Sequence, residues 1–157
     1  MSLPHTKIWD ILNKLGPDHP DVATSYNNLG CVYESKREYD EAIEYHEKSL
    51  KIRLNKLGPD HPDVATTYNN LGIACNGKGE YDKAIKYYEK SFKIRLNKLG
   101  PDHPDVATSY NNLGCVYESK GEYDKAIEYH EKSLKILLNK LGPDHPDIAI
   151  TYYNLGS

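Results

Sequence analysis

Apolar residues recur along the chain at the three- and four-residue spacing of a helix. Near the amino end, the residues that follow this spacing are Ile8, Ile11, Leu12 and Leu15. Gly16 and Pro17 come directly after them, and such a pair ends a helix because proline cannot continue it. The pattern predicts a first helix over residues 3–15.

Two longer amphipathic segments follow. The first opens with Pro20 and Asp21, which suit a helix start because proline fits the first position and a carboxylate opposes the positive helix end. We expect a helix over 20–36 (helix A), a break, and a second helix over 39–57 (helix B). Their buried faces are predicted to comprise Ala23, Tyr26, Leu29, Gly30 and Tyr33 in helix A, and Tyr39, Ala42, Ile43, His46, Leu50 and Leu54 in helix B.

The pair of helices repeats with a fixed period. The stretch Leu-Gly-Pro-Asp-His-Pro-Asp begins at Leu15, Leu57, Leu99 and Leu141, and a constant spacing of about 20 to 50 residues is typical of a repeat array. We therefore expect one all-α array, an alpha-alpha superhelix of stacked hairpins, without separate domains. Its predicted parts are a half-repeat at 3–15, repeat one at 16–57, repeat two at 58–99, repeat three at 100–141, and a last helix A within 142–157.

The three complete repeats are not equally similar in sequence. Repeats one and three differ at three positions between Leu15 and Lys56, whereas repeat two differs from repeat one at eleven. Repeat two contains Gly77 and Gly79, and a glycine inside a helix costs about 1 kcal/mol relative to alanine. We expect its helix A to end early and its hairpin to be the weakest. The segment 3–15 is also divergent, because Asp10 stands where later repeats have isoleucine.

Small residues recur where the two helices of a hairpin should cross. Gly30 and Ala42 return as Gly72 with Ala84 and as Gly114 with Ala126. Small side chains at a crossing let two helices approach closely. We expect the glycine and the alanine of each hairpin to lie at this crossing, with Leu29 and Tyr33 on its flanks in repeat one.

This pattern resembles the tetratricopeptide repeat. The family's aromatic, Leu-Gly, aromatic and post-turn Ala signature is met by Tyr26, Leu29-Gly30, Tyr33, Tyr39 and Ala42, and it recurs in each copy. The longer period, together with His-Pro-Asp-Val-Ala and Asn-Asn-Leu, is most similar to the 42-residue repeats of kinesin light chains. The resemblance implies a right-handed superhelix in which helices A line a concave groove that binds peptides.

Carried across position by position, the family's groove residues form one stripe on each helix A. They are Thr24, Asn27, Cys31 and Glu34 in repeat one, Thr66, Asn69, Ile73 and Asn76 in repeat two, and Thr108, Asn111, Cys115 and Glu118 in repeat three. Their spacing of three, four and three residues independently places each set on one helix face. The three equivalent asparagines would form a ladder along the groove.

Two interpretations of this ladder remain open. Amides both donate and accept hydrogen bonds, so the ladder could bind the backbone of an extended peptide without reading its sequence. Alternatively, the asparagines bond to one another or to the next helix as part of the stack. Tyr153 takes the ladder position in the last helix A, where it either closes the groove or reflects the end of the array.

The charge of the groove differs from that of its relatives. Kinesin light chains, to which the framework is similar, favour acidic, tryptophan-containing peptides through basic groove residues. Here the corresponding stripe offers Glu34, Glu118 and two thiols. We expect a neutral or mildly basic segment to suit this groove better.

The composition limits the classes of partner that we expect for this chain. The formal net charge is −3 and lysines are interspersed with glutamates, so the chain has no basic stripe for nucleic acid. No apolar run approaches the roughly 20 residues that span a bilayer. Three cysteines without a CxxC motif indicate free thiols in a reducing compartment. We expect a cytoplasmic protein with a protein or peptide partner, and neither membrane nor nucleic acid as a partner.

Candidate chemistry is sparse. The Asp-His-Pro-Asp turn contains metal-ligand and acid-base residue types, but it recurs four times at helix starts, where its proline and aspartate serve as helix starter and cap. His46 and His130 fall on the buried side of helix B, where repeat two has Tyr88, so we expect packed, hydrogen-bonded rings. We predict no enzyme activity, no metal and no cofactor.

Two functions remain. The first is a non-catalytic scaffold that binds an extended peptide in the groove. The second is a self-assembly module in which the unpaired terminal half-repeats stack head to tail between chains, as a heterologous contact allows. Dependence of the molar mass on protein concentration would distinguish them.

Overall fold

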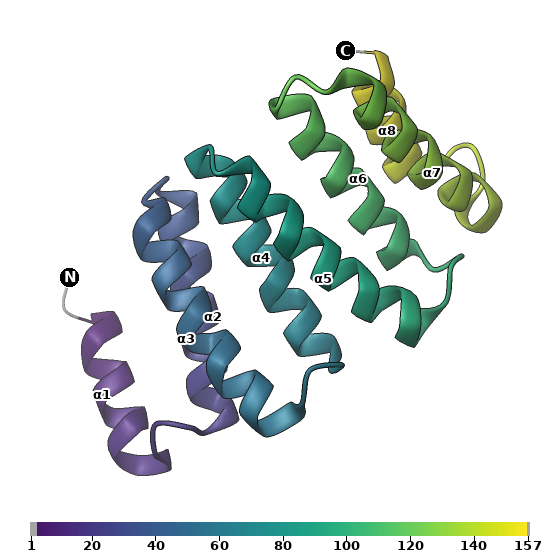
Figure 1. Cartoon of the computed structure of the whole chain (residues 1–157). Coiled ribbons are helices and arrows are strands. Elements are labelled where there is room, and N and C mark those ends of the chain that lie inside the picture. The colour runs from purple at the N-terminus through teal and green to yellow at the C-terminus, as the bar shows by residue number, and fades with distance from the viewer. Residues whose placement is uncertain (1–2, 157) are drawn as a thin grey trace.

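A computed structural model describes residues 3–156, and within them eight helices follow one another without a strand (Figure 1). They are α1 (Leu3–Leu15), α2 (Pro20–Ser35), α3 (Tyr39–Leu57), α4 (Pro62–Lys78), α5 (Tyr81–Leu99), α6 (Pro104–Ser119), α7 (Tyr123–Leu141) and α8 (Pro146–Gly156). The all-α prediction is confirmed. Residues 1, 2 and 157 of the predicted array lie outside the described residues, as does the side chain of Ile8.

The helices stack as consecutive antiparallel hairpins. Helix α2 packs on α3, α4 on α5 and α6 on α7, and each helix B packs on the helix A that follows it. Helices A also contact one another directly, as α2 does with α4 and α4 with α6. This direct contact places helices A on the inner side of the array, which positions the candidate groove.

The predicted helix bounds agree closely with the structure, with one correction. Helix B of repeat one spans Tyr39–Leu57 as predicted, and helix A ends at Ser35, one residue early. The early end predicted for repeat two is wrong, because α4 continues through Gly77 to Lys78. A Cβ built on Gly77 would lie 2.4 Å from Cε1 of Tyr39. A side chain at this position would therefore require the ring of Tyr39, from the preceding repeat, to move.

The repeated helix-A glycine lies under a ring of helix B. A Cβ on Gly30 would lie 2.5 Å from Cε1 of His46. The equivalent glycine of repeat three lies under His130, and that of repeat two under Tyr88. The glycine thus accommodates a buried ring that lies across helix A.

The Asp-His-Pro-Asp turn starts each complete helix A, but its cap was assigned wrongly. The N-cap is the histidine, since Nδ1 of His19 accepts a hydrogen bond of 3.1 Å from the backbone N–H of Asp21. His61 and His103 make the same bond at 3.0 Å. Proline occupies the first turn as predicted. The histidine therefore satisfies a helix-end donor that would otherwise lack a partner.

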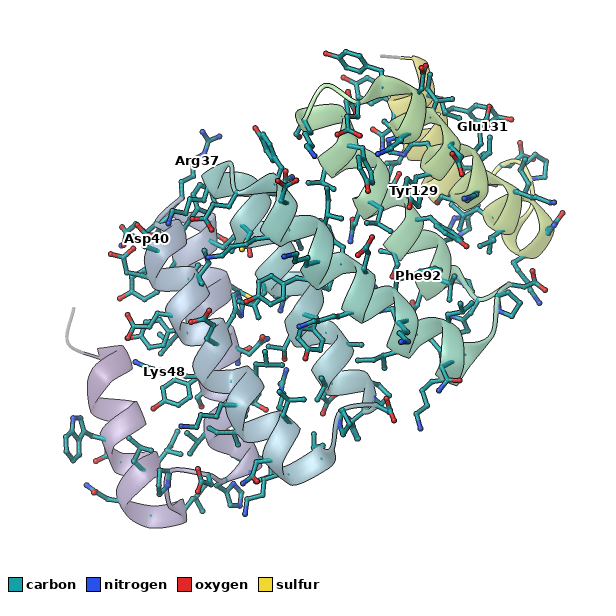
Figure 2. All side chains as sticks on the ribbon, viewed as in Figure 1. Arg37, Asp40, Lys48, Phe92, Tyr129 and Glu131 are labelled. Carbon is teal, nitrogen blue, oxygen red and sulfur yellow. The ribbon has the colours of Figure 1, made fainter. Side chains whose placement is uncertain are left out.

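The turn between helices A and B has a left-handed residue in every repeat. Gly79 and Gly121 adopt φ values of 89° and 84°, whereas repeat one has Arg37 at φ 61°. Arg37 lies at the tip of the first hairpin (Figure 2). The backbone of this turn is conserved between repeats even where glycine is absent.

Candidate peptide-binding groove

The predicted groove residues all lie on helices α2, α4 and α6, which line the inner side of the stack. None of the twelve is fully buried. The three threonines and Cys31 are exposed, and the other eight are half-buried. The stripe is therefore accessible from the surface along three consecutive repeats.

The asparagine ladder is tied into the stack through its oxygens. Nδ2 of Asn70 donates to Oδ1 of Asn27 at 3.1 Å, and Nδ2 of Asn112 donates to Oδ1 of Asn69 at 2.8 Å. Asn154 donates to Asn111 in the same way at 3.1 Å. Each bond joins neighbouring repeats. The side-chain oxygens of the ladder asparagines therefore take part in the stack, which is one of the two interpretations that the sequence left open.

The amide nitrogens of the ladder asparagines differ from their oxygens. No Nδ2 group of Asn27, Asn69 or Asn111 donates a hydrogen bond to the described residues. Each amide is half-buried and is fixed in position by the bond to its oxygen. The stack thus holds three donor groups in orientation on the inner side.

A buried histidine supports the ladder in repeats one and three. Nδ1 of His46 donates to Oδ1 of Asn27 at 3.2 Å, and Nδ1 of His130 donates to Oδ1 of Asn111 at 2.9 Å. An amide oxygen only accepts, so the proton is on Nδ1 and the neutral tautomer is set. The prediction of packed, hydrogen-bonded rings is confirmed, since both side chains are almost completely buried.

Burial keeps these histidines neutral. Desolvation lowers the pKa of His46 from its ordinary value to about 4, and the positive charge of Arg53 adds to this effect. Desolvation also lowers the pKa of His130, although Glu118 opposes the shift. Nε2 of His46 lies 4.0 Å from a carboxylate oxygen of Glu34. Neither ring is suited to accept a proton at neutral pH.

The remaining groove side chains set its polarity. Thr24 donates to the carbonyl oxygen of Pro20 at 3.3 Å, so its hydroxyl is engaged with its own helix. Burial raises the pKa of Glu34. Burial also raises the pKa of the Cys31 and Cys115 thiols. The negative charge of a neighbouring glutamate raises each pKa further.

Repeat two interrupts this pattern. Ile73 packs against the central apolar cluster around Leu113, and Asn76 has a buried Oδ1 without a hydrogen-bond partner among the described residues. Where repeats one and three present a thiol and a carboxylate, repeat two thus presents an apolar side chain and an amide. The candidate groove stripe is therefore neutral in repeat two and carries a carboxylate in repeats one and three.

Sequence reasoning missed the residues that fix the ladder, Asn70, Asn112 and Asn154. For Asn70 and Asn112 the signal was present in the Asn-Asn pair of each complete repeat, because adjacent helical residues project about 100° apart and reach different neighbours. Asn28, the equivalent residue of repeat one, is exposed. Tyr153, at the ladder position of α8, is also exposed.

The structure offers no metal-binding cluster of three or more histidine, cysteine or acidic residues in the part of the chain it describes. Its cysteines are free, and desolvation raises the pKa of Cys75 to about 11. A thiol with a raised pKa is a poor nucleophile. Among the described helices, none has the length and apolar character needed to cross a bilayer.

Comparison with known proteins identifies the repeat. A family model described as "Tetratricopeptide repeat" matches residues 10–55, 32–97, 63–139 and 120–157. A search of curated proteins gave no match.

Solved structures share the fold. BtubC (BKLC) from P. vanneervenii is 32% identical over 88% of this chain, with a TM-score of 0.80, and the chain spans 56% of its length. A putative kinesin light chain with nearly identical TPR-like repeats from Podosopora anserina is 23% identical, with a TM-score of 0.82, over 98% of this chain and 73% of that one. The apo form of RapI is 20% identical, with a TM-score of 0.78, over 93% of this chain and 51% of its own.

Proposed function

Because the chain belongs to the tetratricopeptide repeat family, we propose that it is a non-catalytic scaffold for protein–protein interaction. Its proposed binding site is the inner side of α2, α4 and α6, where an extended peptide segment lies across the three repeats. The free thiols fit a cytoplasmic location.

The observation that carries this proposal is the fixed orientation of the ladder donors. Asn27, Asn69 and Asn111 each hold an unused amide N–H group on the inner side while their oxygens bond within the stack. Carbonyl oxygens of an extended backbone are suitable acceptors for such a row. Little ordering of these side chains is needed on binding, which favours affinity.

The charge of the groove suggests the class of peptide. Glu34 and Glu118 flank the neutral middle formed by Ile73 and Asn76. A segment with an apolar residue at its centre and a lysine or arginine towards each end would complement this arrangement. Acidic segments would be repelled at both ends.

The experiment is a screen of twelve-residue peptides, neutral and basic, followed by calorimetric titration of the tightest binder. We expect Asn69→Ala to weaken binding about tenfold, since it removes one donor to the peptide. Its matched control is Asn112→Ala, which breaks the same inter-repeat hydrogen bond but leaves the Asn69 amide in place. Equal loss of binding in the two variants would show that the ladder acts only through stability.

A second candidate function is self-assembly, and the two ends of the stack favour it. Val32 is 56% exposed and Ile127 is 45% exposed. Their counterparts Val116 and Ile85 are 0% and 9% exposed and lie in one apolar cluster. A head-to-tail contact that brings Val32 of one chain to Ile127 of another would bury both side chains. Because α8 packs on α7 and α1 packs on α2 within the chain, these terminal half-helices would have to move aside or exchange between the two chains.

Light scattering across a hundredfold concentration range tests this candidate. Assembly predicts a molar mass that rises with concentration and returns to the monomer in Ile127→Lys. A constant monomer would eliminate it. One feature opposes assembly through α1, because Asp10 stands at the position of the buried Ile52, and a helix A packed there would have to bury a carboxylate.

A further inference from the structure

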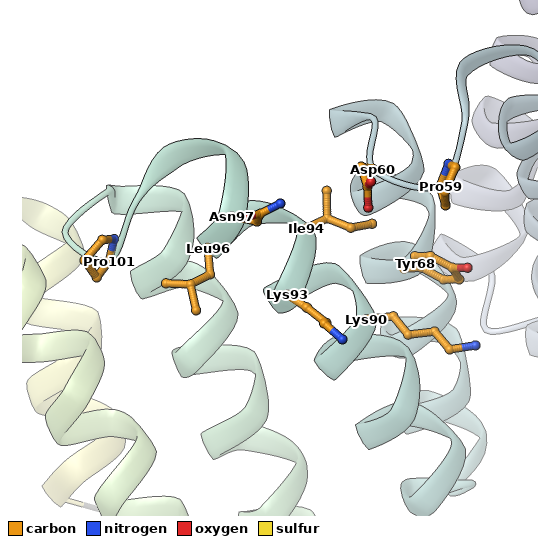
Figure 3. A pocket seen from close by; sticks show the side chains of 9 residues that line it. All are labelled: Pro59, Asp60, Tyr68, Lys90, Lys93, Ile94, Leu96, Asn97 and Pro101. Atoms are coloured by element: carbon orange, nitrogen blue, oxygen red, sulfur yellow. The ribbon is translucent and has the colours of Figure 1, made fainter.

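A separate pocket of about 740 Å³ opens beside α5, away from the groove. Tyr68 and Ile94 line it together with Lys90 and Lys93, and the α3–α4 and α5–α6 loops contribute to its edge (Figure 3). None of the twelve groove residues lines it. The pocket thus combines apolar and aromatic surface with two lysines and one aspartate, Asp60, at its edge, and its volume suits a few side chains of a bound segment.

All nine lining residue types recur in the other repeats. The pocket is lined by Pro59, Asp60, Tyr68, Lys90, Lys93, Ile94, Leu96, Asn97 and Pro101. Residues of the same types stand 42 positions earlier and 42 positions later in the sequence. A difference between the repeats at this surface must therefore come from residues next to the pocket.

The three repeats differ in the ion-pair partner of one equivalent lysine, which is Lys90 in repeat two. Nζ of Lys48 bonds to Glu44 at 2.7 Å in repeat one, and Nζ of Lys132 bonds to Glu128 at 2.7 Å in repeat three. In repeat two the glutamate is replaced by Lys86. Lys90 accordingly has no carboxylate partner within the described residues, and its ammonium lies over the ring of Tyr68, 5.3 Å from the centroid.

Helix α5, which carries Lys90, also has more basic than acidic side chains. Helix α5 carries six basic and two acidic side chains, whereas α3 carries four of each. Lys86, Lys90 and Lys93 are all exposed and recur at four- and three-residue spacing, so they form one row of about 10 Å along the helix. A net-negative chain thus has a local basic surface beside an apolar pocket.

We propose that this pocket is a second binding site, for an acidic protein segment. An apolar side chain of the segment packs on Tyr68 and Ile94, and flanking aspartate or glutamate side chains bind Lys86, Lys90 and Lys93. A small carboxylate would meet only part of a row of this length, which is why the complementary ligand is a segment with several carboxylates. The site is independent of the peptide groove, because it lies on other residues.

The test uses a fluorescein-labelled twelve-residue peptide in which four glutamates flank a central phenylalanine, with fluorescence anisotropy as the readout. We expect Lys86→Glu to weaken binding about tenfold or more, since it restores the glutamate that neutralises the pocket lysine in repeats one and three. Glu128→Lys is the reciprocal variant. It should create a second site in repeat three and raise the stoichiometry from one to two.

Three results would overturn the proposal. They are a Kd of the wild-type chain above about 1 mM, unchanged affinity in Lys86→Glu, or equal binding of a control peptide with glutamine at each glutamate. Circular dichroism of each variant verifies folding. Asn69→Ala should leave this affinity unchanged, which separates the pocket from the groove.

Discussion

Repeats one and three bury a histidine across the helix-A glycine, whereas repeat two buries a tyrosine in the same place. The histidines bond to the asparagine ladder, and the tyrosine does not. The glycine is the same in all three repeats because any Cβ would meet the ring. The comparison shows that the glycine accommodates either kind of flat ring at this position, while the identity of the ring sets other properties.

One of those properties is the response to acid. Repeat two has no titrating group at this position near neutral pH, since burial raises the pKa of Tyr88. Repeats one and three bury a base that is held neutral. Acid should therefore destabilise the outer repeats more than the middle one.

The largest expected effect is loss of stability with falling pH. The pKa of folded His46 is about 4 and its ordinary value is 6.5, so the unfolded chain takes up a proton first. The contribution of neutral His46 to the free energy of unfolding is fully present above its unfolded pKa. It is lost as the pH falls from 6.5 towards 4, and the loss amounts to about 3 kcal/mol. Urea unfolding followed by circular dichroism between pH 7 and pH 4 measures it.

The matched variant is His46→Tyr with His130→Tyr, which copies repeat two into its neighbours. It should remove most of this pH dependence while leaving the capping histidines unchanged. An identical slope in the variant and the wild type would mean that the buried rings do not cause the loss.

A smaller effect is expected from Gly114→Ala. Alanine normally stabilises a helix relative to glycine by about 1 kcal/mol, but here its Cβ would lie 2.6 Å from Cε1 of His130. We expect a net destabilisation of about 2 kcal/mol, as overpacking of a core produces. In the His130→Ala background the sign should reverse, because the ring is gone. A double-mutant cycle in urea tests this reversal.

The smallest effect concerns the turns. Arg37 adopts φ 61° where repeats two and three have glycine, and a left-handed residue with a side chain costs about 1 kcal/mol. We expect Arg37→Gly to stabilise the chain by about that amount and Gly121→Arg to destabilise it by the same amount. Thermal unfolding of both variants measures the two changes. An unchanged unfolding temperature in both variants would show that the strain is relieved elsewhere.

The sequence predicted the helices well for a physical reason. Gly-Pro pairs end each helix B, and proline starts each complete helix A, so the bounds depend on local chemistry. The 42-residue spacing then determined how the hairpins follow one another. The errors arose where a residue's role depends on a neighbour distant in the sequence.

Gly77 illustrates this limit. Its propensity predicts fraying, but Tyr39 of the preceding repeat lies against it and tertiary packing overrides propensity. The groove shows the same limit, because the stripe of Asn69 could be placed from spacing alone while its bond to Asn112 could not. The capping role of His19 was missed because histidine is not among the commonest N-cap residues.

The most direct test of the groove is a nitrogen–proton NMR titration of the 17.9 kDa chain with the tightest neutral or basic peptide. Binding in the groove predicts that the side-chain amide signals of Asn27, Asn69 and Asn111 shift together. Signals from the exposed face of α5, including Lys90, should remain in place. Shifts confined to α5, or no binder in the screen, would contradict the proposal that helices A form the peptide-binding surface.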